Sequence, residues 1–360
     1  MSDERILAAS RLRDFVADLF VAAGVSPRAA LKVAQGLVDA DIEGLHSHGV
    51  MLVDMYIDRL RHGSVSNRET ASTVSSRGGA VVLDAGHALG HLTGEQAMAI
   101  AVGKAREFAS GIVSVRHGFH FGTAGKYALQ AANADCIGIA MCNTRPLMPA
   151  PGGAERVVGN NPIAIAVPTN SEIPLLLDMA TSEAAMGKIR MADKSKTPIP
   201  ASWAVTASGE PTTDAAAAIS GMLLPSGGPK GFGLSFMIDL MSGLLSQGAI
   251  GSEVRPLYGD MTQPYDCSHL FIAIDVAHFC DVQEFRARAA AAAAGIRNGA
   301  RAPGTDQLYS PGEPEWRRRQ QANGQVSINP AVIAMLTRFA DEYGISSACL
   351  AGNTEEKHHG

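Results

Sequence analysis

Two short segments carry the histidines best suited to proton transfer. Residues 46–49 read His-Ser-His-Gly, and residues 117–122 read His-Gly-Phe-His-Phe-Gly. An imidazole titrates near neutral pH, so His120 could accept or give one proton in a reaction. Ser47 and His48 lie where one predicted helix ends and the next begins, and unpaired backbone N–H groups there would favour an anion such as a carboxylate. Structural roles are the alternative, because Ser47 could cap the helix and His120 could bond the backbone.

His117 and His120 have the spacing of a zinc pair, but no third ligand is evident nearby, so we expect no metal.

Two further charged residues, Asp178 and Lys230, stand at positions that suit a ligand. Asp178 follows the apolar run 173–177, where it could contact a ligand or cap a helix. Lys230 lies in a glycine-rich stretch just before a predicted helix, a position that suits a diphosphate or a solvated lysine.

The usual motifs of nucleotide-binding and hydrolytic enzymes are missing. The pattern G-x-G-x-x-G, which brings a pyrophosphate to a helix N-terminus, begins at Gly231 but has Phe236 in place of its third glycine. The residue after Lys230 is a glycine instead of Ser or Thr, so the glycines before it form no Walker motif. G-x-S-x-G and H-E-x-x-H are absent as well. The sequence therefore argues against common ATPases, serine hydrolases and zinc proteases.

Length and composition describe a globular protein of about two domains. The chain has 360 residues, of which 46% are hydrophobic and 18% charged. Domains usually contain roughly 100 to 200 residues, so a chain of this length is expected to form about two. The net charge is −5, which offers none of the clustered basic charge that nucleic-acid binding requires. Aromatic residues make up only 5%, so small aliphatic side chains and methionine must fill the core.

The N-terminus and the cysteines indicate a cytoplasmic protein. The chain begins Met-Ser-Asp-Glu-Arg without an apolar run, so we expect no signal peptide. No stretch approaches the roughly 18 apolar residues of a membrane span. The five cysteines form no C-x-x-C pair, and an odd number cannot close fully into disulfides, so we interpret them as buried thiols.

Periodicity and turn residues predict an α+β fold with a discontinuous helical domain and a mixed-sheet domain. The apolar spacing predicts helices over most of residues 4–63, and short apolar runs bounded by Gly, Asn and Pro predict strands beyond them. We expect the N-terminal helical part over residues 1–75, a mixed α/β part over 76–225, a mainly helical return over 226–345, and a tail over 346–360. The expected strands cover residues 80–83, 112–115, 137–141, 163–167, 173–177 and 270–276. Later helices are expected over residues 94–109, 124–134, 232–245, 282–296 and 329–343.

Several motifs in a shared order resemble the malate/L-lactate dehydrogenase family of the second type. Each is weak alone, but together they run nearly the whole chain and include DIEGLHSHG at 41–49, HFGTAG at 120–125, NTRP at 143–146, LDMATS at 177–182 and GPKGFG at 228–233. The resemblance implies an NAD- or NADP-dependent oxidoreductase, normally a homodimer, whose cofactor domain is not a Rossmann fold. It would act on a small 2-hydroxy or 2-oxo acid. That fold would account for the missing glycine motif.

The resemblance also assigns roles to residues. His120 matches the proton-transfer histidine, Ser47 and His48 match substrate-pocket residues, and Tyr56 lies on the same helical face. The positions that match cofactor contacts of the family are Asn143, Asp178, Met179, Ala180 and Lys230. Pro303 and Gly304 resemble a further cofactor contact.

One departure from the family pattern concerns the substrate carboxylate. Members usually carry an arginine five residues after the serine of Ser-His-Gly, suited to a bidentate grip, but Leu52 stands there. Glu43 also occupies a position where arginine is common. Arg145 could supply the missing charge from another direction. Two alternatives stay open, namely a reductase of cyclic 2-imino acids and a cofactor-binding protein without catalytic activity.

Overall fold

The N-terminal helices bury the apolar faces that their spacing predicts. The computed structural model describes residues 4–351. Helix α2 begins after Ser26, whose hydroxyl accepts the Ala29 N–H at 3.3 Å, with Pro27 at the first helical position. Two short 3-10 turns, His46–His48 and Val50–Leu52, connect α2 to α3. The three helices are α1 Ala9–Ala22, α2 Pro27–Ile42 and α3 Val53–Arg61.

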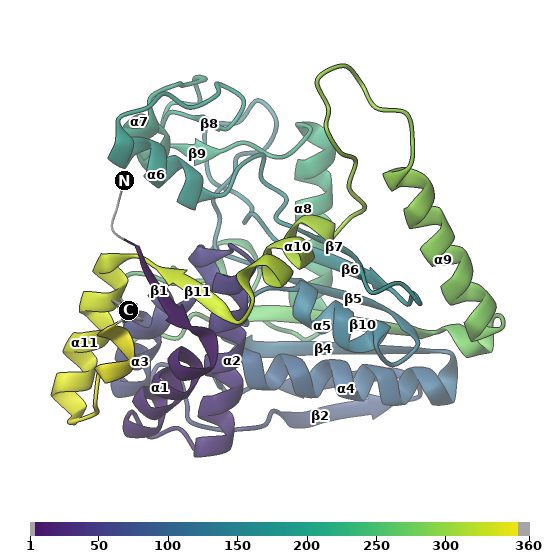
Figure 1. Ribbon diagram of the computed structural model, residues 1–360, viewed down its shortest axis with the longest axis horizontal. Helices are drawn as coiled ribbons and strands as arrows, with labels where there is room; N and C mark the ends of the chain where they lie inside the picture. Colours follow the sequence, from purple (N-terminus) through teal and green to yellow (C-terminus); the bar gives the residue numbers. More distant parts are fainter. Residues whose placement is uncertain (1–3, 352–360) are drawn as a thin grey trace, which may run out of the picture.

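The two ends of the chain share one core, as a discontinuous helical domain requires. Helix α11 (Pro330–Tyr343) packs against α1 and α3, although more than 260 residues separate it from them in sequence (Figure 1). The hydrophobic cluster that contains Phe20 and Leu37 also contains Leu336 and Phe339. The boundaries near residues 75, 225 and 345 stay predictions, and residues 352–360 of the expected tail lie outside the described part of the chain.

A short pair of strands corrects the prediction of a helix beginning near Glu4. Residues Arg5–Ala8 form β1, which runs antiparallel to β11 (Gln325–Ile328). Side chains alternate here, with Ile6 exposed and Leu7 buried, which is the two-residue period of a strand. The partner strand lies some 320 residues away, so local periodicity could not reveal it.

A seven-stranded mixed sheet forms the second part of the molecule. Its strand order is β2-β3-β4-β10-β5-β6-β7, and only the β3–β4 pair is parallel. The late strand β10 lies antiparallel between β4 and β5, so residues from the last third of the chain complete the middle of the sheet. This order is not that of a Rossmann fold, as predicted. The strands are β2 Ser72–Arg77, β3 Ala80–Asp84, β4 Ser110–Gly118, β5 Cys136–Cys142, β6 Ile163–Val167, β7 Leu175–Met179 and β10 Cys267–Asp275.

Helices cover both faces of the sheet. Helices α4 (Gly90–Phe108) and α5 (Gly125–Ala132) pack on one face, and α8 (Pro229–Leu244) packs on the other. Alternation along β10 shows the two faces, because Phe271 belongs to the cluster under α4 and α5 while Leu270 packs with Ile238 of α8.

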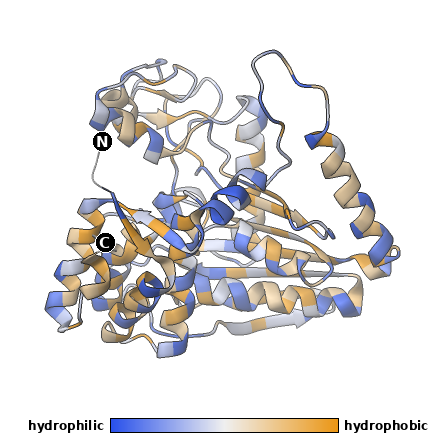
Figure 2. Ribbon diagram, viewed as in Figure 1, coloured by the Kyte–Doolittle hydropathy of each residue, from blue (hydrophilic) through white to orange (hydrophobic). Residues whose placement is uncertain are grey.

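Three further segments surround the sheet. A small lobe with its own hydrophobic cluster contains α6 (Met186–Ser195), β8 (Ala204–Val205), α7 (Ala215–Ser220) and β9 (Met222–Leu223). Helix α9 (Val282–Arg297) extends to one side, and α10 (Glu313–Ala322) returns across the middle of the molecule (Figure 1). Figure 2 shows that α10 is strongly hydrophilic, which explains why no apolar period predicted it. The remaining 3-10 turns are Gly251–Glu253, Val276–His278 and Ala348–Ala351.

The prediction that the cysteines are buried thiols is correct for three residues and wrong for one. Cys136, Cys142 and Cys267 are buried free thiols, and Cys349 is half-buried. Cys280 is exposed, because it lies in the turn between β10 and α9 instead of in the core. Within residues 4–351, no helix has both the length and the apolar character needed to span a membrane.

Candidate active site

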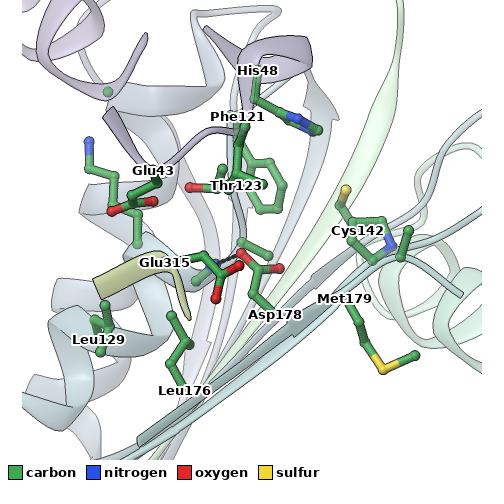
Figure 3. Close-up of a pocket in the computed structure, with 18 of the residues that line it drawn as sticks. Glu43, His48, Phe121, Thr123, Leu129, Cys142, Leu176, Asp178, Met179 and Glu315 are labelled. Atoms are coloured by element: carbon green, nitrogen blue, oxygen red, sulfur yellow. Dashed lines mark hydrogen bonds between the residues drawn. The ribbon is translucent and has the colours of Figure 1, made fainter. Parts of the chain in front are cut away.

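A cavity of about 750 Å³ opens where the helical part, the sheet and α10 meet. Its walls come from the turn at residues 46–48, the loop at 120–125 before α5, the end of β7, and α10. Its size falls within the range of small-molecule binding sites. Segments from four distant parts of the sequence therefore converge on one enclosed space (Figure 3).

One end of the cavity is built on a tyrosine–histidine pair. Tyr56 Oη lies 2.6 Å from His120 Nδ1 and 3.4 Å from the His120 carbonyl oxygen. Tyr56 is fully buried on α3, and its ring packs edge-on against Phe119. The phenol thus fixes one nitrogen of His120, and the other nitrogen is left to face the cavity.

The His-Ser-His-Gly turn brings a second imidazole to the same end. The His48 and His120 rings are stacked with centres 5.4 Å apart, and Ser47 Oγ lies 3.0 Å from His48 Nδ1. The buried Asp41 carboxylate holds the turn, because it accepts the Val50 N–H at 2.7 Å. Any Cβ at Gly49 would overlap that carboxylate, so glycine is required there.

Burial keeps the imidazoles at this end neutral. Desolvation, with a smaller effect of the neighbouring His48, lowers the pKa of His120 to about 3. Desolvation also lowers the pKa of His48, and it lowers that of His269 to about 3. His269 stacks on Phe121 with ring centres 4.6 Å apart. Neutral rings can serve as proton acceptors or as hydrogen-bond donors according to their tautomer.

The tyrosine–histidine pair suits proton transfer in both directions. Burial raises the pKa of Tyr56 well above its ordinary value, so the phenol keeps its proton. When Tyr56 donates to His120 Nδ1, the other ring nitrogen carries the proton and is an acid. When Nδ1–H donates to Tyr56, the cavity-facing nitrogen is a base.

Carboxylates line the other end of the cavity. Asp178 accepts the Gly125 N–H at 2.7 Å, and enclosure by the cavity walls raises its pKa to about 6. Glu43 and Asp39 both contact Arg319 of α10, at 2.8 and 2.9 Å. Burial raises the pKa of Glu43, although the Arg319 contact opposes that rise. Figure 3 shows Glu43, Glu315 and Asp178 around this end.

An apolar wall joins the two ends. Phe121, Leu129, Leu176, Met179 and Trp316 all line the cavity. The cavity therefore combines an apolar wall with polar groups at either end, as small-molecule sites commonly do. Within residues 4–351, no three His, Cys, Asp or Glu side chains are placed to hold a metal ion together.

Comparison with known proteins identifies the family. A sequence profile described as malate/L-lactate dehydrogenase matches residues 7–337. The chain belongs to the malate/L-lactate dehydrogenase family. It is 36% identical to a malate dehydrogenase of Pyrococcus abyssi over 84% of each chain. It is 35% identical to the L-sulfolactate dehydrogenase of Methanocaldococcus jannaschii over 95% of this chain and 98% of that one.

Solved structures have the same fold. The sulfolactate dehydrogenase from Methanocaldococcus jannaschii superposes with a TM-score of 0.90 at 34% identity, covering 95% of this chain and 98% of that chain. A Δ1-piperideine-2-carboxylate reductase from Pseudomonas syringae superposes with a TM-score of 0.82 at 26% identity, covering 93% and 100%. The protein is thus an NAD(P)-dependent oxidoreductase of the CH–OH class, with the predicted mixed α/β fold.

The structure gathers half of the predicted site residues at this cavity. Ser47, His48 and His120 line one end, and Asp178, Met179 and Ala180 line the β7 side. Strand β7 covers Leu175–Met179, so Asp178 lies within the strand and not after it. Tyr56 contacts the cavity through His120.

The other predicted residues lie elsewhere. Asn143 is fully buried, and its amide bonds Asp239 at 2.9 Å and the Ala249 carbonyl at 2.7 Å, so this side chain is used within the protein. Lys230 is exposed on the first turn of α8, and Pro303 and Gly304 are exposed in the loop before α10. Arg145 is half-buried outside the cavity lining.

Several residues that line the cavity were not predicted as site residues. His269 comes from the central strand β10, and Trp316 and Arg319 come from α10. Thr123 belongs to the HFGTAG motif, so the motif could have indicated it. No local signal marks His269, because its position depends on β10 lying between β4 and β5.

Proposed function

We propose that this protein interconverts a 2-hydroxy acid and a 2-oxo acid with His120 as the proton donor and acceptor. The observation that carries the proposal is the Tyr56–His120 pair at one end of an enclosed cavity, with 2.6 Å between phenol oxygen and Nδ1. The phenol leaves the other imidazole nitrogen free to face a substrate. Relatives named malate and sulfolactate dehydrogenases support this class of substrate.

The residues of this chain handle the proton. Bound nicotinamide supplies or accepts the hydride at C2 of the acid. In oxidation, neutral His120 takes the hydroxyl proton on its cavity-facing nitrogen, and Tyr56 accepts a hydrogen bond from Nδ1–H. In reduction, the same nitrogen returns the proton to the oxygen that forms. Ser47 and His48 orient the carboxylate or hydroxyl, because both project into the cavity from the 46–48 turn.

We propose that the cofactor is NAD or NADP, held along the apolar wall between Phe121 and Met179. Asp178 and the backbone of Ala180 border the nicotinamide side. Lys230 stands on the first turn of α8, where helix N–H groups and its ammonium suit a diphosphate. Asn143 lies between the lining residues Cys142 and Thr144, and its bonds to Asp239 and Ala249 hold that segment without direct contact with the cavity. Pro303 and Gly304 are exposed in the loop before α10, outside the cavity lining, and are proposed as a further cofactor contact on the family resemblance alone.

We propose that Arg145, which lies outside the cavity lining but close to the lining residue Tyr265, supplies the positive charge for the substrate carboxylate. Leu52, which replaces the usual arginine, is buried in the helical core and offers no charge. Burial lowers the pKa of Arg145, as do the nearby Arg156 and Arg190 to a smaller extent, so it is in a cationic region. We expect Arg145→Ala to raise KM for the acid by about tenfold or more, the loss of a charge-assisted pair. Arg77→Ala on exposed strand β2 is the control, and an unchanged KM for every accepted acid would contradict this role.

The experiment that tests the function is a substrate panel read at the nicotinamide absorbance band. A set of 2-hydroxy and 2-oxo acids, each assayed with both cofactors, should show turnover for at least one acid. Cofactor binding without turnover across the panel would instead indicate the inactive binding protein. Preformed cyclic imines belong in the same panel, because the likeness to the Δ1-piperideine-2-carboxylate reductase favours imine reduction as the second candidate.

We further propose a cytoplasmic homodimer, since the dinucleotide is available inside the cell. Helix α8 presents exposed Leu234, Met237 and Leu244, an apolar surface of the kind that subunits cover. Light scattering should give twice the chain mass, and a monomer mass would contradict the dimer.

A further inference from the structure

Tyr265 is a buried phenol whose hydroxyl has no partner in the described part of the chain. It lies just before β10, is 5% exposed and lines the cavity. The hydroxyls of Tyr56 and Tyr127, which are also buried, both form hydrogen bonds. Within residues 4–351, Tyr265 accepts the Arg255 N–H on its backbone carbonyl at 3.1 Å, but no group bonds its hydroxyl.

The Tyr265 hydroxyl opens to the cavity. It is not among the unpartnered polar atoms that the protein encloses completely. Because the residue is otherwise buried and lines the cavity, its oxygen faces the cavity space. Buried polar groups in proteins are almost always hydrogen-bonded, so a phenol in this position indicates a polar group of a bound molecule.

Tyr265 lies at the end of the cavity that holds His120. The two residues are linked through Phe119, which directly precedes His120 in the chain. The Phe119 ring packs edge-on against Tyr56, with centres 5.0 Å apart, and edge-on against Tyr265, with centres 6.2 Å apart. A molecule that reaches His120 therefore also comes close to Tyr265.

Helix α3 helps to hold both Tyr265 and His120. Tyr56 of this helix contacts His120, and Arg59 stands one turn later. The Arg59 guanidinium is fully buried and donates to three carbonyl oxygens of segment 256–263, at 2.7 to 3.0 Å. That segment leads directly to Tyr265. A phenol held in this way is already in place when a ligand binds, which lowers the entropic cost of the contact.

The phenol is a neutral donor beside a cation. Burial raises the pKa of Tyr265 well above its ordinary value, although Arg145 and Arg59 oppose that rise, so the hydroxyl keeps its proton. Arg145 lies close enough that it and Tyr265 each affect the pKa of the other. An O–H donor next to a guanidinium suits an anionic oxygen, such as that of a carboxylate.

The distribution of charge along the cavity favours the same position for a carboxylate. At the other end, Glu43, Asp178 and Glu315 line the cavity and would repel a second negative charge. The hydroxyl donors Ser47 and Tyr265 line the end that holds the imidazoles, where the lining contains no carboxylate.

We propose that Tyr265 is a substrate-binding residue whose hydroxyl donates a hydrogen bond to the same substrate carboxylate that Arg145 attracts. The inference rests on the proposed function, because it requires a 2-hydroxy or 2-oxo acid to bind beside His120. Tyr265 takes no part in the proton transfer, so its hydroxyl should affect binding of the acid more than the rate of the reaction.

Steady-state kinetics of Tyr265→Phe test this role. The variant keeps the ring against Phe119 and removes only the hydroxyl. We expect KM for the acid to rise by about tenfold or more, the loss of a hydrogen bond to a charged group, while kcat stays within a few-fold. Cofactor affinity, measured by fluorescence titration, should not change. Tyr258→Phe removes a half-exposed phenol from segment 256–263, outside the cavity lining, and should leave all three quantities unchanged.

A double variant tests whether Tyr265 and Arg145 serve one carboxylate. The increase in KM for Tyr265→Phe with Arg145→Ala should be smaller than the product of the two single increases, because a carboxylate that has lost one contact is held less firmly by the other. An increase equal to that product or larger would overturn the shared carboxylate.

Two further outcomes separate this inference from the proposed function. If wild type turns over an acid, an unchanged KM in Tyr265→Phe, or a fall in kcat with KM unchanged, would overturn the role of Tyr265 alone. If wild type turns over no acid with either cofactor, the proposed function fails and the role of Tyr265 fails with it.

Discussion

The two ends of the cavity carry opposite kinds of titratable group, and burial acts on both. At the imidazole end, desolvation lowers the pKa of His120 and His269 to about 3. At the carboxylate end, enclosure raises the pKa of Asp178 to about 6. Each shift disfavours the charged form of its group, so both ends tend toward neutrality although their chemistry differs.

The difference lies in what each end offers as a partner. Tyr56 bonds His120 on the side away from the cavity, so that ring has a fixed orientation and one free nitrogen. Glu43 and Asp39 instead share the cation Arg319, which ties α10 to α2. The geometry of the imidazole end suits the proton transfer that we propose, whereas the ion pairs of the carboxylate end hold α10 against α2.

The largest effect should come from removing the imidazole of His120. We expect His120→Ala to lower kcat by about 10²- to 10⁴-fold, the usual contribution of a general acid or base. Cofactor affinity should change little, because the carboxylate end and the apolar wall stay intact. Steady-state kinetics and cofactor fluorescence titration measure the two quantities. Unaltered turnover would refute the assignment of the proton to His120.

A smaller effect should follow from removing only the hydroxyl that orients His120. Tyr56→Phe keeps the buried ring but removes the 2.6 Å contact with Nδ1. A hydrogen bond to a group that becomes charged contributes about 1.5–3 kcal/mol, so kcat should fall roughly 10- to 100-fold. The KM for the acid should change less than kcat. An equal loss in Leu52→Ala, which disturbs the same core without touching His120, would indicate a packing effect instead.

The sequence predicted the imidazole end better than the carboxylate end. Residues 46–49 and 117–122 are compact motifs at helix and strand boundaries, so local rules and the family resemblance both indicated Ser47, His48 and His120. Asp178 was also predicted from its position at the end of an apolar run. Arg319 lies on a hydrophilic helix that no apolar period revealed.

The remaining parts depend on long-range pairing that local patterns do not record. A strand was predicted near residues 270–276, where β10 lies. Its position between β4 and β5, which places His269 against Phe121, could not be predicted. The β1–β11 pair joins residues 5–8 to 325–328 for the same reason. Local periodicity identifies which face of an element is buried, whereas the partner of that face is decided by the whole chain.

Acid should destabilise the protein through the imidazole end. The folded-state pKa of His269 is about 3, whereas its ordinary value is 6.5, so the unfolded chain binds a proton that the folded chain does not. Stability should therefore fall as pH drops from 6.5 toward 3, by about 1.4 kcal/mol per pH unit for each such histidine. Urea unfolding at several pH values gives the free energy of unfolding at each pH. In His269→Asn, the slope of this free energy against pH should be smaller than in wild type by the equivalent of about one proton.

His46 provides a control of opposite sign. Its hydrogen bond to Asp41 at 2.9 Å raises its pKa, so its contribution to stability is present below its ordinary pKa and is lost as pH rises. His46→Asn should therefore remove a gain in stability that wild type shows as pH falls toward 6.5, and it should leave the slope below 6.5 unchanged, whereas His269→Asn should reduce the loss between pH 6.5 and 3. The same slope in both variants would show that these histidines do not set the acid sensitivity.

The smallest effect should appear at the carboxylate end. The pKa of Asp178 is raised to about 6 from 3.8, so its carboxyl favours the folded state below pH 3.8, and that contribution is lost as pH rises through 6. Asp178→Asn keeps an oxygen that can accept the Gly125 N–H at the start of α5. We expect the variant to gain stability relative to wild type between pH 4 and 7, by less than about 1 kcal/mol because the carboxylate opens onto the cavity. Thermal unfolding across that range measures the difference. A variant that instead loses stability steadily with rising pH would show that the ionised carboxylate is favoured at this end, and the contrast between the two ends would then rest on His120 and His269 alone.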